Sequence, residues 1–340
     1  MLQSLYHCDG QTLSRWVREE VDLANPLIAW DLDQASDQTM MSGGAMAQMR
    51  RSPAWVALEQ SNDWGEVLAT LAAYYQQVGV GLFAHHWAFR WQDGRVWGIP
   101  YPDAVRLDDL VGYDAQRTAL VTNTEALLAG YRALHVLLYG SRGSGKSSLV
   151  KGLLWQYGDR GLRLIEVSKT DLKDLTLIVD QLRHLPQKFV IFVDDLSFEE
   201  DEDTYKGLKV VLEGNLTARP TNIVVYATSN RRHLIREFFG DRPRPSDADE
   251  VHAWDTVQEK LSFSDRFGLT LTFEPANQDT YLAIVRHLAQ QADLAIAAGE
   301  LEYRALQWAT RHNGRSGRTA RQFVDFLQAE QGLRDQSSHS

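Results

Sequence analysis

The apolar residues of this chain recur with two periods, one typical of amphipathic helices and one typical of buried strands. Short apolar runs bounded by turn residues have the length and composition of strands buried on both faces, and they fall at residues 135–139, 162–167, 189–193 and 221–227. Stretches with apolar residues at helical spacing alternate with them, at residues 148–157, 172–185 and 205–213. Strands that alternate with helices in this way predict an α/β domain built around a parallel sheet.

The two ends of the chain have a different pattern. Before residue 102, helical spacing occurs at residues 12–24 and 64–78, and residues 89–99 alternate around Asp93–Gly94, which is typical of a β-hairpin. After residue 275 the pattern is helical, with three segments at residues 278–291, 301–312 and 319–328. We therefore expect a mainly helical N-terminal accessory domain over residues 1–102, an α/β domain over 103–275, a helical domain over 276–334 and a frayed tail over 335–340.

The N-terminal part is rich in tryptophan, since it holds seven of the ten tryptophans of the chain. One interpretation is a small helical core with a hairpin, because tryptophan is highly buried on average. The other is a surface that docks a protein partner, because tryptophan often anchors interfaces. His85 and His86 are adjacent here without a further ligand at helical spacing, so we do not expect a metal site.

The composition, with 44% hydrophobic and 24% charged residues, is that of an ordinary globular protein. Cys8 is the only cysteine, so no internal disulfide can form and a reducing cytoplasm is the expected compartment. The N-terminus lacks the pattern of a signal peptide, and no apolar run approaches the ~20 residues that span a bilayer. The formal charge of −10 argues against extensive nucleic-acid coating and leaves a local basic face open.

Residues 140–147, GSRGSGKS, match the phosphate-loop pattern G-x-x-x-x-G-K-[ST] between a predicted strand and a predicted helix. Such a loop aims backbone N–H groups and a helix N-terminus at one point, which suits a polyphosphate. The lysine can reach the β- and γ-phosphates, and the hydroxyl that follows it can hold Mg²⁺. The pattern predicts nucleoside triphosphate binding by Gly140, Ser141, Arg142, Gly143, Ser144, Gly145, Lys146, Ser147 and Ser148.

Asp194 stands at the carboxyl end of the apolar run 189–193, where α/β sheets place groups that face the ligand. An aspartate at this point can hold the Mg²⁺ of a bound nucleotide, directly or through water. The sequence therefore predicts a magnesium site that combines Ser147 and Asp194. The acidic run 199–203 is expected to be a solvated loop, with a second carboxylate for the site as the alternative.

Several segments together resemble the AAA+ ATPases. Residues 107–128 read LDDLVGYDAQRTALVTNTEALL upstream of the phosphate loop, residues 264–273 read SDRFGLTLTF, and residues 316–323 read SGRTARQF. With VDDLSFEEDEDTYKGLKVVLEG and YATSNRRHL, the joint pattern resembles the bacterial ATPases of domain-of-unknown-function family 815. The resemblance covers about residues 107–328, and it implies an AAA+ P-loop module, with a parallel sheet between helices, followed by a helical lid.

The resemblance also implies roles for single residues. Val111 and Gly112 would line the adenine pocket. Asp195 would orient the attacking water, at a position where most AAA+ enzymes carry Glu, and Glu199 or Glu200 could assist it.

Three further roles concern polar and basic residues. Asn230 would be the sensor-1 residue, which hydrogen-bonds the γ-phosphate or the attacking water. Arg266 would be an arginine finger that reaches the nucleotide of a neighbouring subunit, with a surface ion pair as the alternative. The sensor-2 arginine of the lid would be Arg318, with Arg321 as the second choice.

We therefore expect a cytoplasmic, Mg²⁺-dependent AAA+ ATPase that binds ATP and ADP, assembles into a homo-oligomer and remodels or loads an unidentified partner through its N-terminal domain. One alternative is a switch or scaffold that binds ATP and hardly hydrolyses it, which the shorter Asp195 favours. Another is a DNA-associated loader that uses the basic stretch 231–244.

Overall fold

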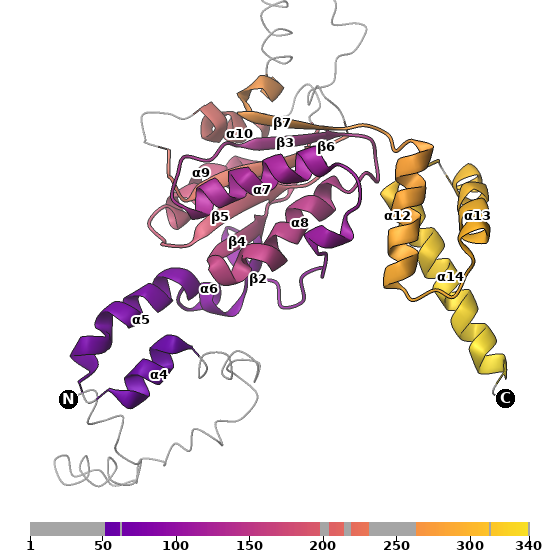
Figure 1. Cartoon of the computed structure of the whole chain (residues 1–340). Coiled ribbons are helices and arrows are strands. Elements are labelled where there is room, and N and C mark those ends of the chain that lie inside the picture. Colours follow the sequence, from indigo (N-terminus) through magenta and orange to yellow (C-terminus); the bar gives the residue numbers. More distant parts are fainter. Residues whose placement is uncertain are drawn as a thin grey trace, which may run out of the picture. The chain divides into compact units, whose positions relative to one another are not determined.

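The computed structural model describes residues 52–61, 63–197, 204–213, 219–230, 263–312 and 314–338 (Figure 1). The chain divides into two compact units, Met1–Gly81 and Leu82–Ser340. The predicted helix at 12–24, Cys8, the candidates Glu199 and Glu200, and the basic stretch 231–244 lie outside the described residues. Within the described ranges, no helix is both long and apolar enough to cross a bilayer.

The described part of the first unit consists of two helices, α4 (Pro53–Gln60) and α5 (Trp64–Val78). Asp63 caps α5, because its side chain accepts a hydrogen bond from the backbone N–H of Gly65. The helix predicted at residues 64–78 is thus present with the same bounds.

The second unit is built around a seven-stranded sheet with the strand order β2-β1-β4-β5-β6-β3-β7. All neighbouring pairs are parallel except β1 and β2, which form the antiparallel hairpin. The strand that leads into the phosphate loop, β3, lies between β6 and β7. The strands are β1 (Ala88–Gln92), β2 (Arg95–Gly98), β3 (Val136–Gly140), β4 (Leu162–Glu166), β5 (Lys188–Val193), β6 (Ile223–Ser229) and β7 (Leu269–Phe273).

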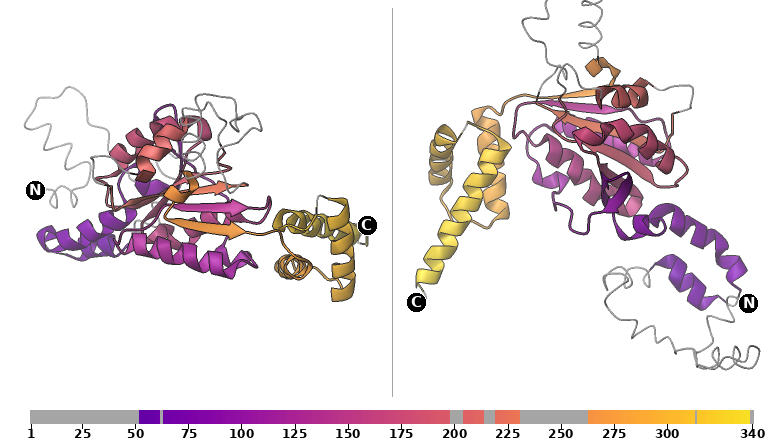
Figure 2. Two further views of the ribbon diagram at one scale, coloured as in Figure 1. Left: turned by 90° about the horizontal axis from the view of Figure 1, so that it is seen from above. Right: turned by 180° about the vertical axis from the view of Figure 1, so that it is seen from behind.

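Helices cover both faces of this sheet, as Figures 1 and 2 show. One face carries α7 (Asp114–Leu128) and α8 (Lys146–Tyr157), and the other carries α9 (Leu175–Leu182) and α10 (Thr204–Glu213). Consecutive strand residues alternate between the two cores: in β5, Val190 packs with the α7 and α8 side, while Ile191 packs with the α9 and α10 side. The short connections include the 3-10 helices η1 (Leu107–Asp109), η2 (Gly158–Arg160), η3 (Lys169–Asp174) and η5 (Phe263–Arg266), and the one-turn helix α6 (Leu82–His85).

The C-terminal helices α12 (Gln278–Gln291), α13 (Ala298–Arg311) and α14 (Gly317–Ser338) form a lid with a hydrophobic core of its own. Tyr281 and Phe323, both fully buried, belong to this core.

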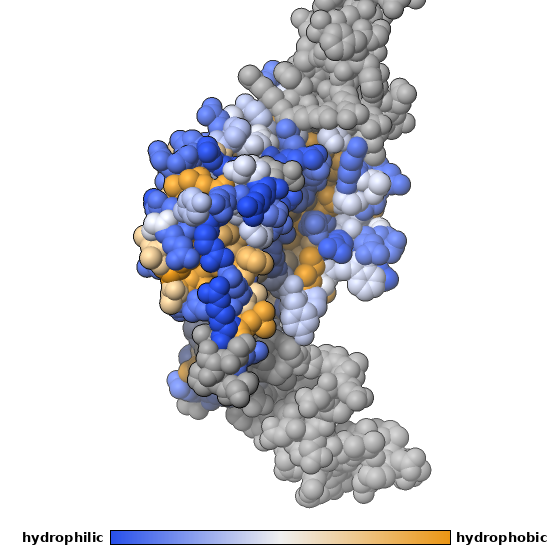
Figure 3. Space-filling view, turned by 90° about the vertical axis from the view of Figure 1, so that its right-hand side faces the viewer, coloured by the Kyte–Doolittle hydropathy of each residue, from blue (hydrophilic) through white to orange (hydrophobic). Residues whose placement is uncertain are grey.

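The face drawn in Figure 3 is mostly hydrophilic, with apolar patches between the polar side chains. The predicted fold class, an α/β P-loop module with a C-terminal helical lid, is confirmed.

The position of the hairpin does not agree with the domain boundary that we expected at residue 102. It lies in the second unit, where β1 pairs in parallel with β4 and extends the main sheet. Trp91 is only 1% exposed and donates a hydrogen bond from its indole nitrogen to Asp174. The hairpin joins the sheet because burial of Phe89 and Trp91 against the α9 side stabilises that arrangement.

The end of the chain also differs from expectation. The frayed tail predicted from residue 335 begins inside α14, which continues to Ser338. Charged side chains support the preceding turn, since Arg334 and Arg304 both form ion pairs with Glu330.

Candidate functional site

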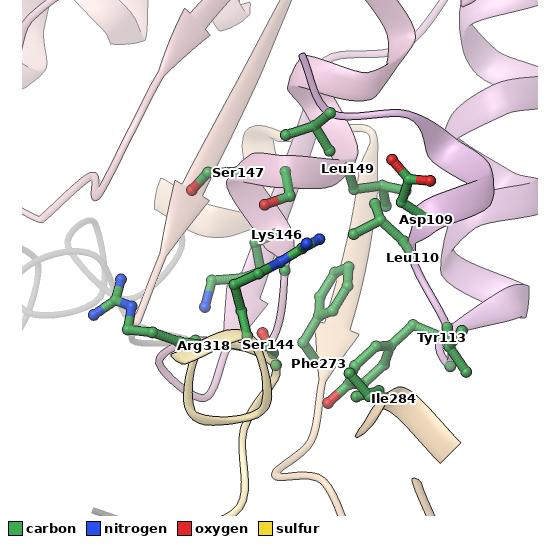
Figure 4. A pocket seen from close by; sticks show the side chains of 18 of the residues that line it. Asp109, Leu110, Tyr113, Ser144, Lys146, Ser147, Leu149, Phe273, Ile284 and Arg318 are labelled. Carbon is green, nitrogen blue, oxygen red and sulfur yellow. The ribbon is translucent and has the colours of Figure 1, made fainter. Parts of the chain in front are cut away.

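A cavity of about 1020 Å³ lies at the carboxyl ends of the strands, where α12 and α14 of the lid face the phosphate loop (Figure 4). A cavity of this size can hold a nucleoside triphosphate. The structure brings most of the predicted site residues together around it. Those that line the cavity are Val111, Gly112, Arg142, Gly143, Ser144, Gly145, Lys146, Ser147, Ser148, Asp194, Asp195, Asn230, Arg318 and Arg321.

Three predicted residues do not line the cavity. Gly140 and Ser141 are connected to the cavity through Lys146, because their carbonyl oxygens accept hydrogen bonds from its side chain. Arg266 ends η5 just before β7, at the amino edge of the sheet, whereas the cavity lies at the carboxyl edge. Its own chain therefore does not present Arg266 to this cavity.

The phosphate loop has the backbone that its glycines permit. Gly140 has a φ of 138°, and a Cβ at this position would lie 1.9 Å from the carbonyl oxygen of Phe273. Gly143 has a φ of 72° and lies so close to the lid that a Cβ would approach the hydroxyl of Ser316 to 2.9 Å. The loop therefore requires glycine both for conformation and for close packing. It leads into α8, whose first residues, Lys146 to Ser148, line the cavity, and the first N–H groups of a helix have no intrahelical partner.

Lys146, the first residue of α8, is 6% exposed, and its ammonium group lies over the loop. It donates hydrogen bonds to the carbonyl oxygens of Gly140 (3.0 Å) and Ser141 (2.7 Å) and to the side-chain oxygen of Asn230 (3.3 Å). Burial lowers the pKa of this ammonium, and the nearby charges of Asp194 and Asp195 act in the opposite direction. A buried ammonium of this kind gains from a polyphosphate anion.

The two expected metal residues lie in contact. The hydroxyl of Ser147 donates a hydrogen bond of 2.6 Å to Oδ1 of Asp194, which follows the last residue of β5. Hydroxyl and carboxylate oxygens are the ligands that Mg²⁺ prefers, with the remaining positions filled by water and substrate phosphates. Among the described residues, no group of three or more His, Cys, Asp or Glu side chains could hold a metal ion by itself. The donor set at Ser147 and Asp194 fits the magnesium of a bound nucleotide.

Asp195 adopts a left-handed backbone conformation, with a φ of 51°. Its carboxylate accepts a hydrogen bond of 2.6 Å from the side-chain amide of Asn230, which comes directly after β6. The residues predicted to orient the attacking water and to sense the γ-phosphate are therefore direct neighbours at the same edge of the cavity.

Sequence reasoning missed Thr228, the penultimate residue of β6. Its hydroxyl bonds to both aspartates: it donates to Oδ1 of Asp194 and accepts from the backbone N–H of Asp195. A hydroxyl residue at the end of a buried strand, beside the strand that ends in Asp194, was the available signal. The prediction assigned that strand end to Asn230 alone.

One end of the cavity is lined largely by apolar side chains. Val111 and Gly112 lie there, together with Leu110, Tyr113 and Phe273. The rings of Tyr113 and Phe273 have centroids 4.9 Å apart, and the hydroxyl of Tyr113 donates to the carbonyl oxygen of Glu274. Such a surface suits an aromatic base.

The lid completes this apolar end with residues that the sequence did not identify. Ile284, Leu288 and Gln291 of α12 line the cavity, and the amide of Gln291 donates a hydrogen bond of 2.6 Å to the carboxylate of Asp109. These residues lie more than 160 positions from the segment around Val111, so only the fold brings them together.

The lid also touches the phosphate loop. The backbone N–H of Arg318 donates a hydrogen bond of 3.2 Å to the carbonyl oxygen of Gly143, and Figure 4 shows Arg318 beside the loop. Arg318 and Arg321 both line the cavity, so the choice between them as sensor 2 remains as the sequence left it. Arg142 and Lys146 of the loop lie at the same cavity as these two arginines, and such a group of cations favours an anionic ligand.

Several solved structures of known proteins are similar to part of this chain. The Holliday junction branch migration motor RuvB of Thermotoga maritima is similar at 16% identity over 65% of this chain and 63% of that chain, with a TM-score of 0.45. The replication initiator DnaA, in a structure with AMPPCP and single-stranded DNA, is similar at 16% identity over 70% of each chain, with a TM-score of 0.45. A DNA replication initiation factor is similar at 16% identity over 69% of this chain and 68% of that chain, with a TM-score of 0.42.

The present chain spans less than two thirds of the length of that RuvB chain. No curated protein sequence matches it. The sequence profile of one family, described as a protein of unknown function (DUF815), matches residues 84–331. Because this match spans most of the chain and includes the phosphate loop, both aspartates and most of the lid, the chain belongs to the DUF815 family.

Proposed function

We propose that this protein is a Mg²⁺-dependent ATPase that hydrolyses ATP to remodel or load a partner. The observation that carries the proposal is the hydrogen-bonded chain Lys146–Asn230–Asp195 at the phosphate end of the cavity. Through the amide of Asn230 it connects an ammonium group that can bind the phosphates to a carboxylate that can orient a water molecule. Simple nucleotide binding does not require this second carboxylate.

In this proposal the phosphates lie against the loop and the N-terminus of α8, with Lys146 at the β- and γ-phosphates. Ser147 and Asp194 hold the magnesium ion, which offsets the charge that develops on the transferred phosphoryl group. Asp195 accepts a hydrogen bond from the attacking water and orients it in line with the bond that breaks. Asn230 hydrogen-bonds both Asp195 and the γ-phosphate and so fixes their relative positions.

The remaining parts of the site act on the base and on the charge. The apolar end formed by Val111, Gly112 and Phe273 takes the adenine ring, and Arg318 or Arg321 contacts the phosphates from the lid. Arg266 serves the site of a neighbouring subunit in a homo-oligomer, because its place at the amino edge keeps it from its own cavity. The N-terminal domain, expected over residues 1–102, binds a protein partner, and the protein acts in the cytoplasm.

The proposal is tested by measuring nucleotide affinity and phosphate release on wild type, Lys146→Ala and Asp195→Asn. We expect Mg²⁺-dependent release by the wild type, loss of binding in Lys146→Ala, and retained binding without release in Asp195→Asn. If the wild-type protein binds ATP but releases no phosphate at any protein concentration tested, the proposed ATPase activity is wrong. The Asp195→Asn chain, loaded with ATP, is then the bait for capturing the partner.

A second candidate function is an ATP-dependent switch with little hydrolysis. It is favoured by one observation, the hydrogen bond of 2.6 Å that ties the carboxylate of Asp195 to Asn230 and occupies one of its two oxygens. The phosphate-release measurement separates the two functions. A DNA-associated loader is a third candidate, and DNA binding that weakens steeply with salt would support it.

A further inference from the structure

Thr228 lies where two neighbouring strands end beside the cavity. Val193 of β5 pairs with Ala227 of β6, so the residue after Val193, which is Asp194, lies next to Thr228. The side chain of Thr228 is buried, with 2% of the residue exposed. Its position between the two aspartates therefore results from the register of the sheet and is held by the surrounding core.

The single hydroxyl of Thr228 serves both aspartates at once. Oγ1 donates its hydrogen to Oδ1 of Asp194 and accepts a hydrogen bond of 2.9 Å from the backbone N–H of Asp195. A hydroxyl has one hydrogen to donate and lone pairs to accept, so the two bonds are compatible and their direction is set.

A third bond comes from the backbone. The carbonyl oxygen of Thr228 accepts a hydrogen bond of 2.7 Å from the N–H of Leu196, which is fully buried. One residue thus holds three consecutive residues, Asp194 to Leu196. This matters because Asp195 has a φ of 51°, a conformation that persists only where the surroundings hold it.

We propose that Thr228 is a positioning residue for both carboxylates of the site. It acts through Asp194 and Asp195, at the edge of the cavity that it helps to line. Oδ1 of Asp194 accepts bonds from Thr228 and Ser147 and a further one of 3.2 Å from the backbone N–H of Asp195, so these bonds fix the orientation of the carboxylate. The bond to the N–H of Asp195 keeps the second carboxylate at the cavity edge. This inference rests on the proposed ATP hydrolysis.

The decisive variant is Thr228→Val, which keeps the shape of the side chain and removes both hydrogen bonds. Loss of a residue that orients a metal ligand costs about 10- to 100-fold in metal affinity or activity. We expect kcat to fall by this factor. The factor by which Mg²⁺ raises the affinity for an ATP analogue should fall equally, while the affinity without Mg²⁺ stays unchanged. Thr228→Ser, which keeps the hydroxyl, restores both.

Thr124→Val is the matched control. Thr124 is fully buried, and its hydroxyl also makes two hydrogen bonds, to the carbonyl oxygen of Leu120 and with the hydroxyl of Tyr226. It does not line the cavity. Its loss lowers the melting temperature and leaves kcat and the Mg²⁺ dependence unchanged, so the comparison separates positioning from general destabilisation.

Two results overturn the inference: a folded Thr228→Val chain with wild-type kcat and Mg²⁺ dependence, or a Thr124→Val chain with the same losses. If Thr228→Val does not fold, Thr228→Cys replaces it, since a thiol is a weak donor and acceptor of similar size. A wild type that releases no phosphate refutes the proposed function alone, because the Mg²⁺ titration of analogue affinity still tests the effect of Thr228 on Asp194.

Discussion

The side-chain amide of Asn230 connects Lys146 to Asp195. Its nitrogen donates a hydrogen bond of 2.6 Å to the carboxylate of Asp195, and its oxygen accepts one of 3.3 Å from the lysine ammonium. An amide has a donor end and an acceptor end, so this pair of partners sets the orientation of the group. The arrangement lets Asn230 link the position of a phosphate to the position of the carboxylate beside it.

Replacing Asn230 by alanine is expected to lower kcat by about 10²-fold or more, because a fixed donor beside the reacting phosphate is lost. Nucleotide affinity should change much less, since the phosphate loop and Lys146 remain. Steady-state phosphate release and analogue binding measure the two effects. Asn222→Ala is the control, because Asn222 is buried and donates to the carbonyl oxygens of Leu182 and Leu185 away from the cavity. Equal turnover in wild type and Asn230→Ala contradicts the role of Asn230.

The left-handed backbone of Asp195 predicts an asymmetric response to substitution. Asn tolerates a φ of 51° as well as Asp does, whereas Glu does so less readily. We expect Asp195→Asn to fold and bind nucleotide without turnover. Asp195→Glu should be less stable by about 1 kcal/mol and should not exceed the wild-type kcat. Thermal unfolding and phosphate release check both. A Glu variant that is stable and faster than wild type would show that the backbone does not restrict this position.

The lowered pKa of Lys146 leads us to expect that nucleotide affinity depends on pH. Burial lowers the pKa of its ammonium, so the charge is lost at a lower pH than in a free lysine. Triphosphate binding favours the charged form, so affinity should fall as the pH rises through the pKa of the lysine. We expect this decline in analogue titrations at pH values below the ordinary pKa of a lysine. Lys146→Ala should bind weakly at every pH, and a wild-type affinity that is constant over the range contradicts the assignment.

Arg266 predicts cooperation between subunits. If it completes the site of a neighbour, mixing Arg266→Ala chains with Lys146→Ala chains should restore activity, because one mixed interface pairs an intact loop with an intact arginine. An arginine finger contributes about 10³-fold or more to turnover, so the rescue is measurable. Activity per chain should also rise with protein concentration. An Arg266→Ala chain with wild-type turnover at all concentrations would assign this residue to a local ion pair.

His135 predicts sensitivity of the fold to acid. It is 3% exposed, its Nδ1 accepts a hydrogen bond from the N–H of Val225, and burial lowers its pKa to about 3. In the unfolded chain its pKa is about 6.5, so between these values the unfolded state binds more protons than the folded state. The stability is therefore fully present above about pH 6.5 and falls with decreasing pH by up to about 1.4 kcal/mol per unit.

Urea unfolding at pH 7 and pH 5.5 measures this slope. His135→Leu, although less stable overall because Val225 loses its acceptor, should show a smaller slope. A slope that is identical in wild type and His135→Leu would exclude His135 as its source.

The sequence by itself determined the elements whose signals are local. The phosphate loop, the buried strands, the helix at residues 64–78 and the three lid helices were predictable, because hydrophobic period, glycine spacing and capping act over a few residues. The two aspartates could be placed at the cavity for the same reason, since they end a strand whose burial is evident in its composition.

Only the tertiary structure decided where separate segments meet. The hairpin at residues 89–99 belongs to the main sheet because β1 pairs with β4, a contact across more than 70 residues of chain. The apolar end of the cavity joins Val111 to Ile284 of the lid, and Arg266 lies at the opposite edge of the sheet from its own phosphate loop. The direction of the Thr228 hydroxyl depends on strand register and on the left-handed turn at Asp195. Such contacts follow from the packing of the whole sheet and leave no periodic signal in the sequence around them.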